Sequence, residues 1–326
     1  MLNLEEIERK IPVLAGFTAH YRKAAVPVLA RFESQRRNAI VFMFLSIVPL
    51  CGALVLMAYE QNLPEEVMLI SVLTFCGAIG LFFLGVTQLR ASRRKAKVAL
   101  VHLICHYLGF IYREKPDHSF VNCFKELGLV ARYEAMYLED ELSGEVSGLR
   151  FVIQEAALMD WKTRPVNPVF SHFRRVEDRF HGLIGSIECP TAFSATTVVT
   201  YKKNILEKLS EQSLPGQRVF TGGTEFDAAF CVFSTDKGEA LELLSPESQR
   251  RLLKLNAFFN NGLAFAYHRG HFWFTAHRQS DWMETRGDVD DVSDERYAAL
   301  LALDVAMIHH LLDVLGVRQK AEIIEV

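Results

Sequence analysis

Two histidine pairs have spacings that suit metal binding. His102 and His106 lie four residues apart in a segment expected to be helical, so both imidazoles would share one helix face. His268 and His271 flank a two-residue turn. Neither pair comes with an identifiable third ligand, and the first lacks the adjacent glutamate that zinc proteases use as a base. We therefore predict no metal site.

Motifs for nucleophilic or phosphate chemistry are missing from the sequence. It contains no Gly-x-Ser-x-Gly, no Gly-x-x-x-x-Gly-Lys and no Gly-x-Gly-x-x-Gly. We therefore expect no cofactor. If the chain is an enzyme, its site must come from residues distant in sequence, and Glu155, His181, Asp227 and His268 are unranked candidates.

Two long uncharged apolar runs dominate the N-terminal part of the 326-residue chain. They cover residues 38–59 and 67–89, which are 22 and 23 residues long. A helix needs roughly 20 residues to cross the hydrocarbon core of a bilayer. The runs therefore predict a two-helix transmembrane hairpin.

The charges that flank the runs predict an orientation. The first 37 residues hold seven basic side chains, whereas the loop at 60–66 has three glutamates and no Lys or Arg. A basic cluster follows the second run: Arg90, Arg93, Arg94, Lys95 and Lys97. Because positive loops stay on the cytoplasmic side, we expect both termini in the cytoplasm, the loop outside, and the basic cluster at the surface of anionic lipid.

Composition excludes other classes of function. Neither apolar run contains Asp, Glu, Lys, Arg or His, which argues against a transporter or pump. The net charge of −3 gives no basic field for nucleic acid. The six cysteines lack paired spacing, which favours a reducing compartment.

The remaining sequence, residues 90–326, is long enough for a domain of its own. We expect helices up to about 112, at 119–127, at 246–259 and at 295–315. Strands are expected at 141–146, 149–154, 179–189, 196–202, 226–233, 262–268 and 271–278, with a long connection at 205–224. Strands and helices fall in blocks without βαβ alternation, so we predict an α+β fold with an antiparallel sheet and packing helices. The domains would be a cytoplasmic amphipathic N-terminal helix (1–37), the transmembrane hairpin (38–89) and the cytoplasmic domain (90–326).

An aromatic hairpin in this domain has two interpretations. Phe265, Tyr267, Phe272 and Trp273 alternate along its two strands. They could form a face for a protein partner, but alternating aromatics usually cover an adjacent helix, so a place in the core is favoured.

The order of several motifs resembles a bacterial membrane family, domain of unknown function 3137. The resemblance starts with the N-terminal helix at 32–37 and the two apolar runs, and continues through 140–151, Phe180-His181-Gly182-Leu183, residues 226–234 and 243–246. It implies an anchored cytoplasmic α+β domain and supplies no catalytic residues.

Together these patterns predict a non-enzymatic protein of the bacterial inner membrane. A cytoplasmic domain anchored in the lipid bilayer by the helical hairpin would bind a protein partner or self-associate, with no nucleic acid and no cofactor involved. Two alternatives remain open. One is a small channel built from oligomerised hairpins, and the other is an enzyme with a site assembled from distant residues.

Overall fold

The structure, a computed structural model, describes residues 3–58, 64–162, 175–189, 191–201, 214–278, 282–283, 291 and 294–314. It divides into two compact units. The first contains residues 1–104 and 284–303, and the second contains residues 105–283 and 304–326. Helices α3 (Glu65–Leu108) and α9 (Glu295–Val314) contribute residues to both.

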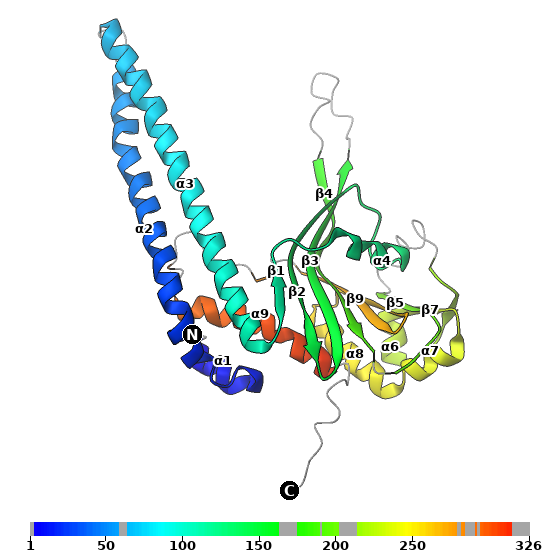
Figure 1. The fold of residues 1–326 in the computed structure, drawn as a ribbon. Helices are drawn as coiled ribbons and strands as arrows, with labels where there is room; N and C mark the ends of the chain where they lie inside the picture. The colour runs from blue at the N-terminus through cyan, green and yellow to red at the C-terminus, as the bar shows by residue number, and fades with distance from the viewer. Residues whose placement is uncertain are drawn as a thin grey trace. The chain divides into compact units, whose positions relative to one another are not determined.

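The first unit is built on two long helices, α2 (Phe17–Ala58) and α3, which contain residues 38–58 and 67–89 of the two apolar runs (Figure 1). Residue 59 lies outside the described residues. They pack closely where Gly85 of α3 meets α2. A Cβ on Gly85 would lie 2.5 Å from Met43 Cγ and 3.1 Å from Ala39 O. A side chain there would push the helices apart, so this glycine sets their separation.

Charged side chains are buried on α2 just before its apolar run. The Glu33 carboxylate accepts hydrogen bonds from Arg36 Nε at 2.7 Å and Arg36 Nη2 at 2.6 Å, and from Arg37 Nε at 2.8 Å. Glu33 and Arg36 are both buried. Two guanidinium groups thus neutralise one buried carboxylate, which reduces the cost of removing it from water.

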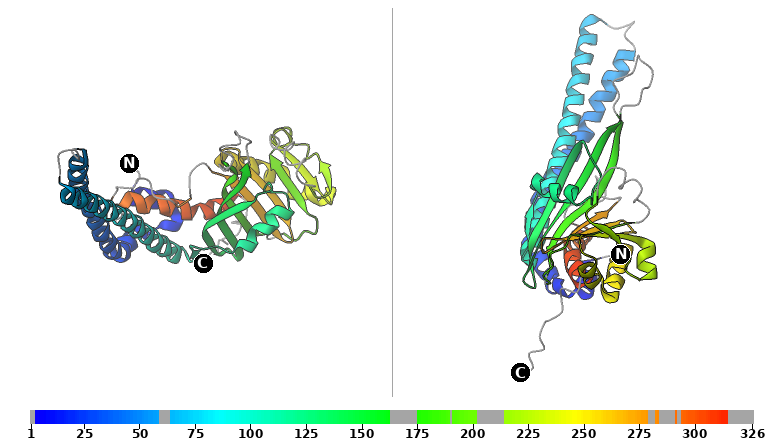
Figure 2. Two further views of the ribbon diagram at one scale, coloured as in Figure 1. Left: turned by 90° about the horizontal axis from the view of Figure 1, so that it is seen from above. Right: turned by 90° about the vertical axis from the view of Figure 1, so that its right-hand side faces the viewer.

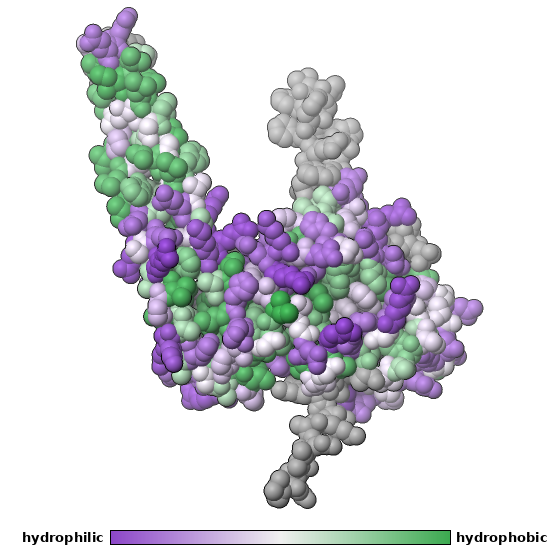
Figure 3. Space-filling model, in the orientation of Figure 1, coloured by the Kyte–Doolittle hydropathy of each residue, from purple (hydrophilic) through white to green (hydrophobic). Residues whose placement is uncertain are grey.

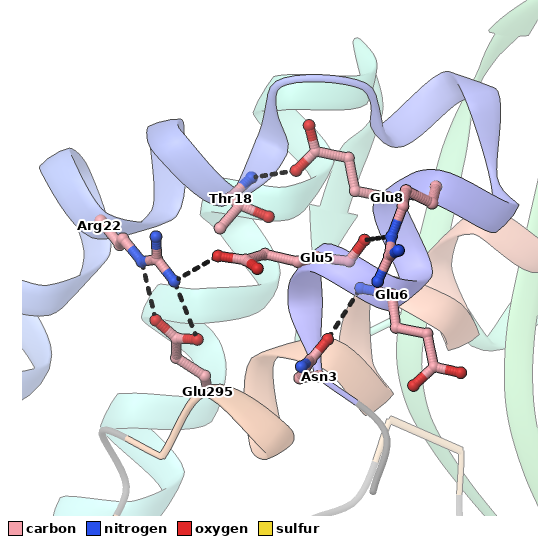
Figure 4. Close-up of polar contacts among 8 residues, drawn as sticks. Asn3, Glu5, Glu6, Glu8, Thr18, Arg22 and Glu295 are labelled. Atoms are coloured by element: carbon pink, nitrogen blue, oxygen red, sulfur yellow. Dashed lines mark hydrogen bonds and ion pairs between the residues drawn. The ribbon is translucent and has the colours of Figure 1, made fainter.

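Shorter elements precede α2, and polar contacts tie them to it (Figure 4). Helix α1 (Leu4–Lys10) is capped by Asn3, whose Oδ1 accepts a hydrogen bond from Glu6 N, and the 3-10 turn η1 (Pro12–Leu14) follows. Glu8 accepts hydrogen bonds from the amides of Gly16 and Thr18 at the start of α2. Arg22 pairs with Glu5 at 3.0 Å and with Glu295 of α9 at 2.9 Å, so it links three helices.

The second unit contains a nine-stranded antiparallel sheet in the order β1-β2-β3-β4-β9-β8-β5-β7-β6. The strands are β1 (Ile111–Arg113), β2 (Ala135–Val146), β3 (Leu149–Lys162), β4 (Arg175–Glu188), β5 (Thr197–Tyr201), β6 (Gln217–Val219), β7 (Phe230–Ser234), β8 (Leu263–His268) and β9 (His271–His277). The expected α+β fold with an antiparallel sheet is confirmed.

Two hairpins follow the sequence closely. Ser147 and Gly148 have φ of +54° and +79° between β2 and β3, and Arg269 and Gly270 have φ of +49° and +76° between β8 and β9. Positive φ at both central residues matches the right-handed twist of paired strands. These turns fix the registers in which Val146 pairs with Leu149 and His268 with His271.

The two faces of the sheet have different covers. One face carries the 3-10 turn η3 (His118–Phe120) and α4 (Val121–Glu126), where Phe124 packs with Leu158, Ile184 and Ala266. The other face lies against α6 (Thr224–Ala229), α7 (Lys237–Leu243) and α8 (Pro246–Phe258), as Figures 1 and 2 show. Side chains alternate between faces along each strand, so Phe265 and Ala266 belong to different layers.

Part of the expected secondary structure differs from the structure. Residues 226–233 do not form one strand, because α6 occupies 224–229 and only 230–234 form β7. Glu225 and Asp227 lie in the first turn of α6, where acidic side chains stabilise a helix. Of the connection expected at 205–224, residues 205–213 lie outside the described ranges, 217–219 form β6, and α6 begins at Thr224.

Candidate functional site

The outer surface of α2 and α3 is apolar. Only 11% of the residues in the most apolar window of each helix are buried, and Figure 3 shows hydrophobic surface over much of this pair. Val48 of α2 is 75% exposed and Leu73 of α3 is 63% exposed. Both helices are long and apolar enough to cross a membrane. Apolar patches this extensive are rare on the surface of a soluble monomer.

The basic cluster lies on α3 directly after this surface. Arg90, Arg94 and Lys95 are exposed, Arg93 is half-buried and Lys97 is buried. The cluster therefore continues one helix without a break, so its distance from the apolar run is set by the helix rise of 1.5 Å per residue. Its role at a lipid surface stays a prediction.

Two of the four candidates for an assembled site lie together on the sheet. Glu155 of β3 and His181 of β4 place Oε1 and Nε2 3.8 Å apart, and Glu155 is buried. His181 Nδ1 lies 3.1 Å from the carbonyl oxygen of Arg278. A carbonyl only accepts hydrogen bonds, so Nδ1 carries the proton. Nε2 then attracts the carboxylate only when the imidazole is doubly protonated.

The same pair fixes a distant piece of backbone. Glu155 Oε1 accepts a hydrogen bond from Trp282 N at 2.8 Å, and Arg278 N donates to His181 O at 3.0 Å. Gly182 makes this approach possible. Its φ is +150°, and a Cβ there would lie 2.1 Å from Ala276 O. These contacts give Glu155 and His181 an anchoring role.

A cavity of about 550 Å³ lies beside His181, between β4, β9 and the end of α8. Its lining includes Arg179 and Arg278, and Glu155 is not part of it. Arg179 pairs with Asp160 at 2.8 Å, and Arg278 lies 3.5 Å from Asp304. The structure therefore brings together the carboxylate of Glu155 and the imidazole of His181, as an assembled enzyme site would need. Of the two, only His181 lines the cavity.

The other two candidates make their contacts elsewhere. Asp227 accepts hydrogen bonds from Thr221 N at 3.1 Å and Gly222 N at 3.0 Å, so it orders the turn before α6. His268 Nδ1 lies 2.8 Å from Thr196 Oγ1. Burial lowers the pKa of His268 below its ordinary value, so its imidazole is mostly neutral at pH 7.

The aromatic hairpin is divided between the two layers. Phe265 and Phe272 are buried, with ring centroids 5.2 Å apart, so these two belong to the core rather than to an exposed partner face. Trp273 is partly buried on the other side of the sheet, against Phe120 and Phe124. Tyr267 lines a second cavity. Strand alternation explains this division, because every second residue of a covered sheet faces the same layer.

The histidine pair on α3 is exposed at both positions, His102 and His106. Within the described ranges, no group of three or more His, Cys, Asp and Glu side chains is placed to hold a metal ion.

Sequence reasoning missed an anchor at Trp282 and Met283. Both side chains are buried, and Met283 has a φ of +54°. Asp304 Oδ2 accepts a hydrogen bond from Met283 N at 3.2 Å. Burial raises the pKa of Asp304, although Arg278 opposes the shift. The only sequence signal was a single tryptophan, Trp282, in a polar stretch. It does not indicate that the carboxylates of Glu155 and Asp304 accept hydrogen bonds from this segment.

Comparison with known proteins identifies a family segment. A family profile described as "Protein of unknown function (DUF3137)" matches residues 178–316, from β4 to just beyond α9. No curated protein matches the chain. A solved structure titled "crystal structure of the mycobacterial trehalose monomycolate transport factor A, TtfA" is similar with a TM-score of 0.30 and 10% identity. That likeness covers 68% of this chain and 96% of the other, and its TM-score is too low to transfer a function. The family resemblance seen in the sequence is therefore confirmed over residues 178–316, where the DUF3137 profile matches.

Proposed function

We propose that the protein is an inner-membrane protein in which α2 and α3 cross the bilayer and the second unit is a non-enzymatic cytoplasmic binding or scaffold domain. The exposed apolar surface of α2 and α3 is the observation that carries this proposal. Val48 and Leu73 would be costly in water, at about 25 cal/mol for each Å² of apolar surface. In a bilayer the same surface is stabilising.

Charge supports the orientation. Basic residues lie before the run in α2 and after the run in α3, and the loop between them is acidic. Both termini are therefore cytoplasmic in this proposal. The buried Glu33–Arg36 pair lies on α2 just before the run, where side chains leave the hydrocarbon.

The chemistry of the second unit favours binding over catalysis. Glu155 and His181 hold backbone groups at Arg278 and Trp282, which is what a structural pair does. The apolar runs contain no Asp, Glu, Lys, Arg or His to line a conducting path, which weighs against the channel. A partner protein or a second copy of the chain is the proposed occupant of the binding domain.

Membrane fractionation with reporter fusions tests the anchor. We expect the full-length protein to stay in membranes after an alkaline carbonate wash. A phosphatase that is active only outside the cytoplasm should be active when inserted in the loop at 60–66 and silent at the C-terminus. Release by carbonate, or the reverse reporter pattern, would overturn the proposed topology.

Purification in detergent with light scattering tests the binding function. We expect the mass of the protein component to exceed 37.0 kDa, either as a defined homo-oligomer or as a stoichiometric complex. A monodisperse monomer that co-purifies with no other protein would count against scaffold and self-association alike.

A further inference from the structure

A smaller cavity of about 250 Å³ opens at the end of β4, next to α7, the first turn of α8 and the β8–β9 hairpin. Its lining combines three aromatic rings with three carboxylates: Phe193, Tyr267 and Phe272 with Glu188, Glu239 and Glu242. Among the residues that the structure describes, no Lys, Arg or His belongs to the lining. All of these residues lie in the second unit, within the segment matched by the family profile.

The rings form walls that stand at steep angles to each other. Phe193 and Tyr267 have centroids 5.7 Å apart and planes at 84°, and Tyr267 and Phe272 have centroids 5.3 Å apart and planes at 64°. The face of an aromatic ring carries partial negative charge and attracts cations within about 6 Å. These rings contact each other edge to face, so a group that binds in the cavity lies beside them and meets the face of one ring and the edge of another.

The carboxylates differ in how far their charge is neutralised. Glu188 accepts a hydrogen bond from Arg150 Nε at 2.8 Å, so its charge is paired. Glu239 accepts hydrogen bonds from the amides of Ser194 and Ala195, which keep it in place without cancelling its charge. Glu242 is exposed and makes no hydrogen bond or ion pair within the described ranges. Two carboxylates therefore leave the cavity with a negative potential.

The other polar groups of the wall are neutral. Burial raises the pKa of the Cys189 thiol to about 12, so the thiol stays protonated at pH 7. Burial also raises the pKa of Tyr267, so its hydroxyl stays neutral. These groups add no positive charge to oppose a cation and no reactive thiolate.

We propose that this cavity binds an alkylammonium group, with the cation against the rings of Phe193 and Tyr267 and its charge balanced by Glu239 and Glu242. Ligand pockets commonly measure about 300 to 1,000 Å³, so this cavity suits a small amine or one side chain. An anion would meet uncompensated carboxylates. The ammonium group comes either from a free amine or from a lysine of a protein partner.

This inference rests on the proposed binding function of the second unit but not on the membrane anchor. Fractionation and reporter fusions test the anchor, and ligand titration tests the cavity. A soluble result in the first experiment would leave the second interpretable, because each lining residue belongs to the second unit.

The experiment is a calorimetric titration of the full-length protein in detergent with n-butylammonium chloride at constant ionic strength. Two uncharged or anionic analogues, 1-butanol and butyrate, are titrated in parallel. We expect saturable binding of butylammonium, at least tenfold tighter than that of either analogue. Comparable binding of all three, or no binding of butylammonium at 50 mM, would overturn the proposal.

Substitutions locate the binding. Glu242→Gln keeps the shape of an exposed residue and removes its charge, and we expect at least a threefold weaker affinity. Phe193→Leu keeps apolar volume and removes a ring, with a similar loss expected. Glu225→Gln is the matched control, since Glu225 is exposed in the same unit and does not line the cavity. If Glu242→Gln binds as tightly as Glu225→Gln, the site is elsewhere and the proposal fails.

A peptide pair separates the two sources of the ammonium group. Acetyl-Ala-Lys-Ala-amide is compared with the same peptide carrying norleucine, which lacks the charge. Binding of the lysine peptide at least tenfold tighter than butylammonium would assign the cavity to a partner's lysine. Weaker binding than butylammonium would assign it to a free amine. Equal binding of the lysine and norleucine peptides would contradict recognition of the charge.

Discussion

Leu73 of α3 and Leu263 of β8 are both leucines in regular secondary structure, but 63% of Leu73 is exposed and Leu263 is fully buried. The same contrast holds for many residues of the two regions. The second unit has a buried apolar core between its sheet and helices, whereas most residues in the apolar windows of α2 and α3 are not buried. Burial drives folding only when water is the alternative. In the proposed function, the two regions meet different solvents.

The largest effect should separate buried from outward-facing phenylalanines. Phe265→Ala in the sheet should lower the free energy of unfolding of the second unit by about 3 to 5 kcal/mol, because it removes a fully buried ring. Phe44→Ala in α2, where Phe44 is 67% exposed, should leave that value unchanged. Urea unfolding followed by near-ultraviolet circular dichroism in detergent measures both. Equal losses of unfolding free energy in the two variants would contradict the difference in burial between the two regions.

The second largest effect should come from a charge on the outer surface of α3. Leu73→Arg places a guanidinium within the first third of the apolar run, at an insertion cost below the roughly 2.5 to 3.5 kcal/mol of an arginine at a helix centre. We expect a large loss of carbonate-resistant protein. Leu241→Arg is the control, because Leu241 of α7 in the second unit is 37% exposed and should tolerate the charge. If both variants remain membrane-bound to the same extent, α3 does not span.

A smaller effect is expected from the hydrogen bond that Glu155 accepts from the Trp282 amide in the second unit. Glu155→Ala leaves the amide of Trp282 without its acceptor, and we expect a loss of about 1 to 3 kcal/mol in the free energy of unfolding. Glu155→Gln keeps an acceptor oxygen and should lose less. Fluorescence of the buried Trp282 reports on the anchor. Equal losses with Gln and Ala would show that the charge beside His181 dominates over the hydrogen bond, because both variants remove the charge and only Ala removes the acceptor.

The smallest expected effect concerns pH. Burial raises the pKa of Asp304 in the folded protein, so its contribution to stability is fully present below the unfolded pKa of about 3.9 and is lost as pH rises through the folded pKa. Relative to Asp304→Asn, the wild type should therefore lose stability as pH increases from 4 to 7. The Tm difference across that range measures it. An opposite slope would mean that Arg278 outweighs burial.

Local sequence patterns predicted most of the helices and strands in both regions. The two-residue turns at 147–148 and 269–270 lie between strands expected from the sequence, and each has glycine at its second position. The helix expected at 246–259 forms over 246–258, with Ser245 as its cap and Pro246 in its first turn. The helix α6 and the strand β7 were merged, because a short amphipathic helix and a short strand share the same apolar residues.

The candidate site depended on contacts that no local pattern records. Glu155 and Trp282 are 127 positions apart, yet one hydrogen bond joins them. The close approach at Gly182 brings β4 against Ala276, and only there does His181 reach the carbonyl of Arg278. The cavity lined by Phe193, Tyr267 and Glu242 likewise draws on segments far apart in the chain.

The sequence by itself determined the two apolar helices, their charge asymmetry, the α+β class and the family resemblance, because each depends on composition or on spacing along one segment. Tertiary structure alone decided which aromatics are core, which two of the four polar candidates meet, and where the two cavities lie. The physical reason is that burial and polar pairing are properties of long-range packing, and a strand residue's environment depends on what covers its face.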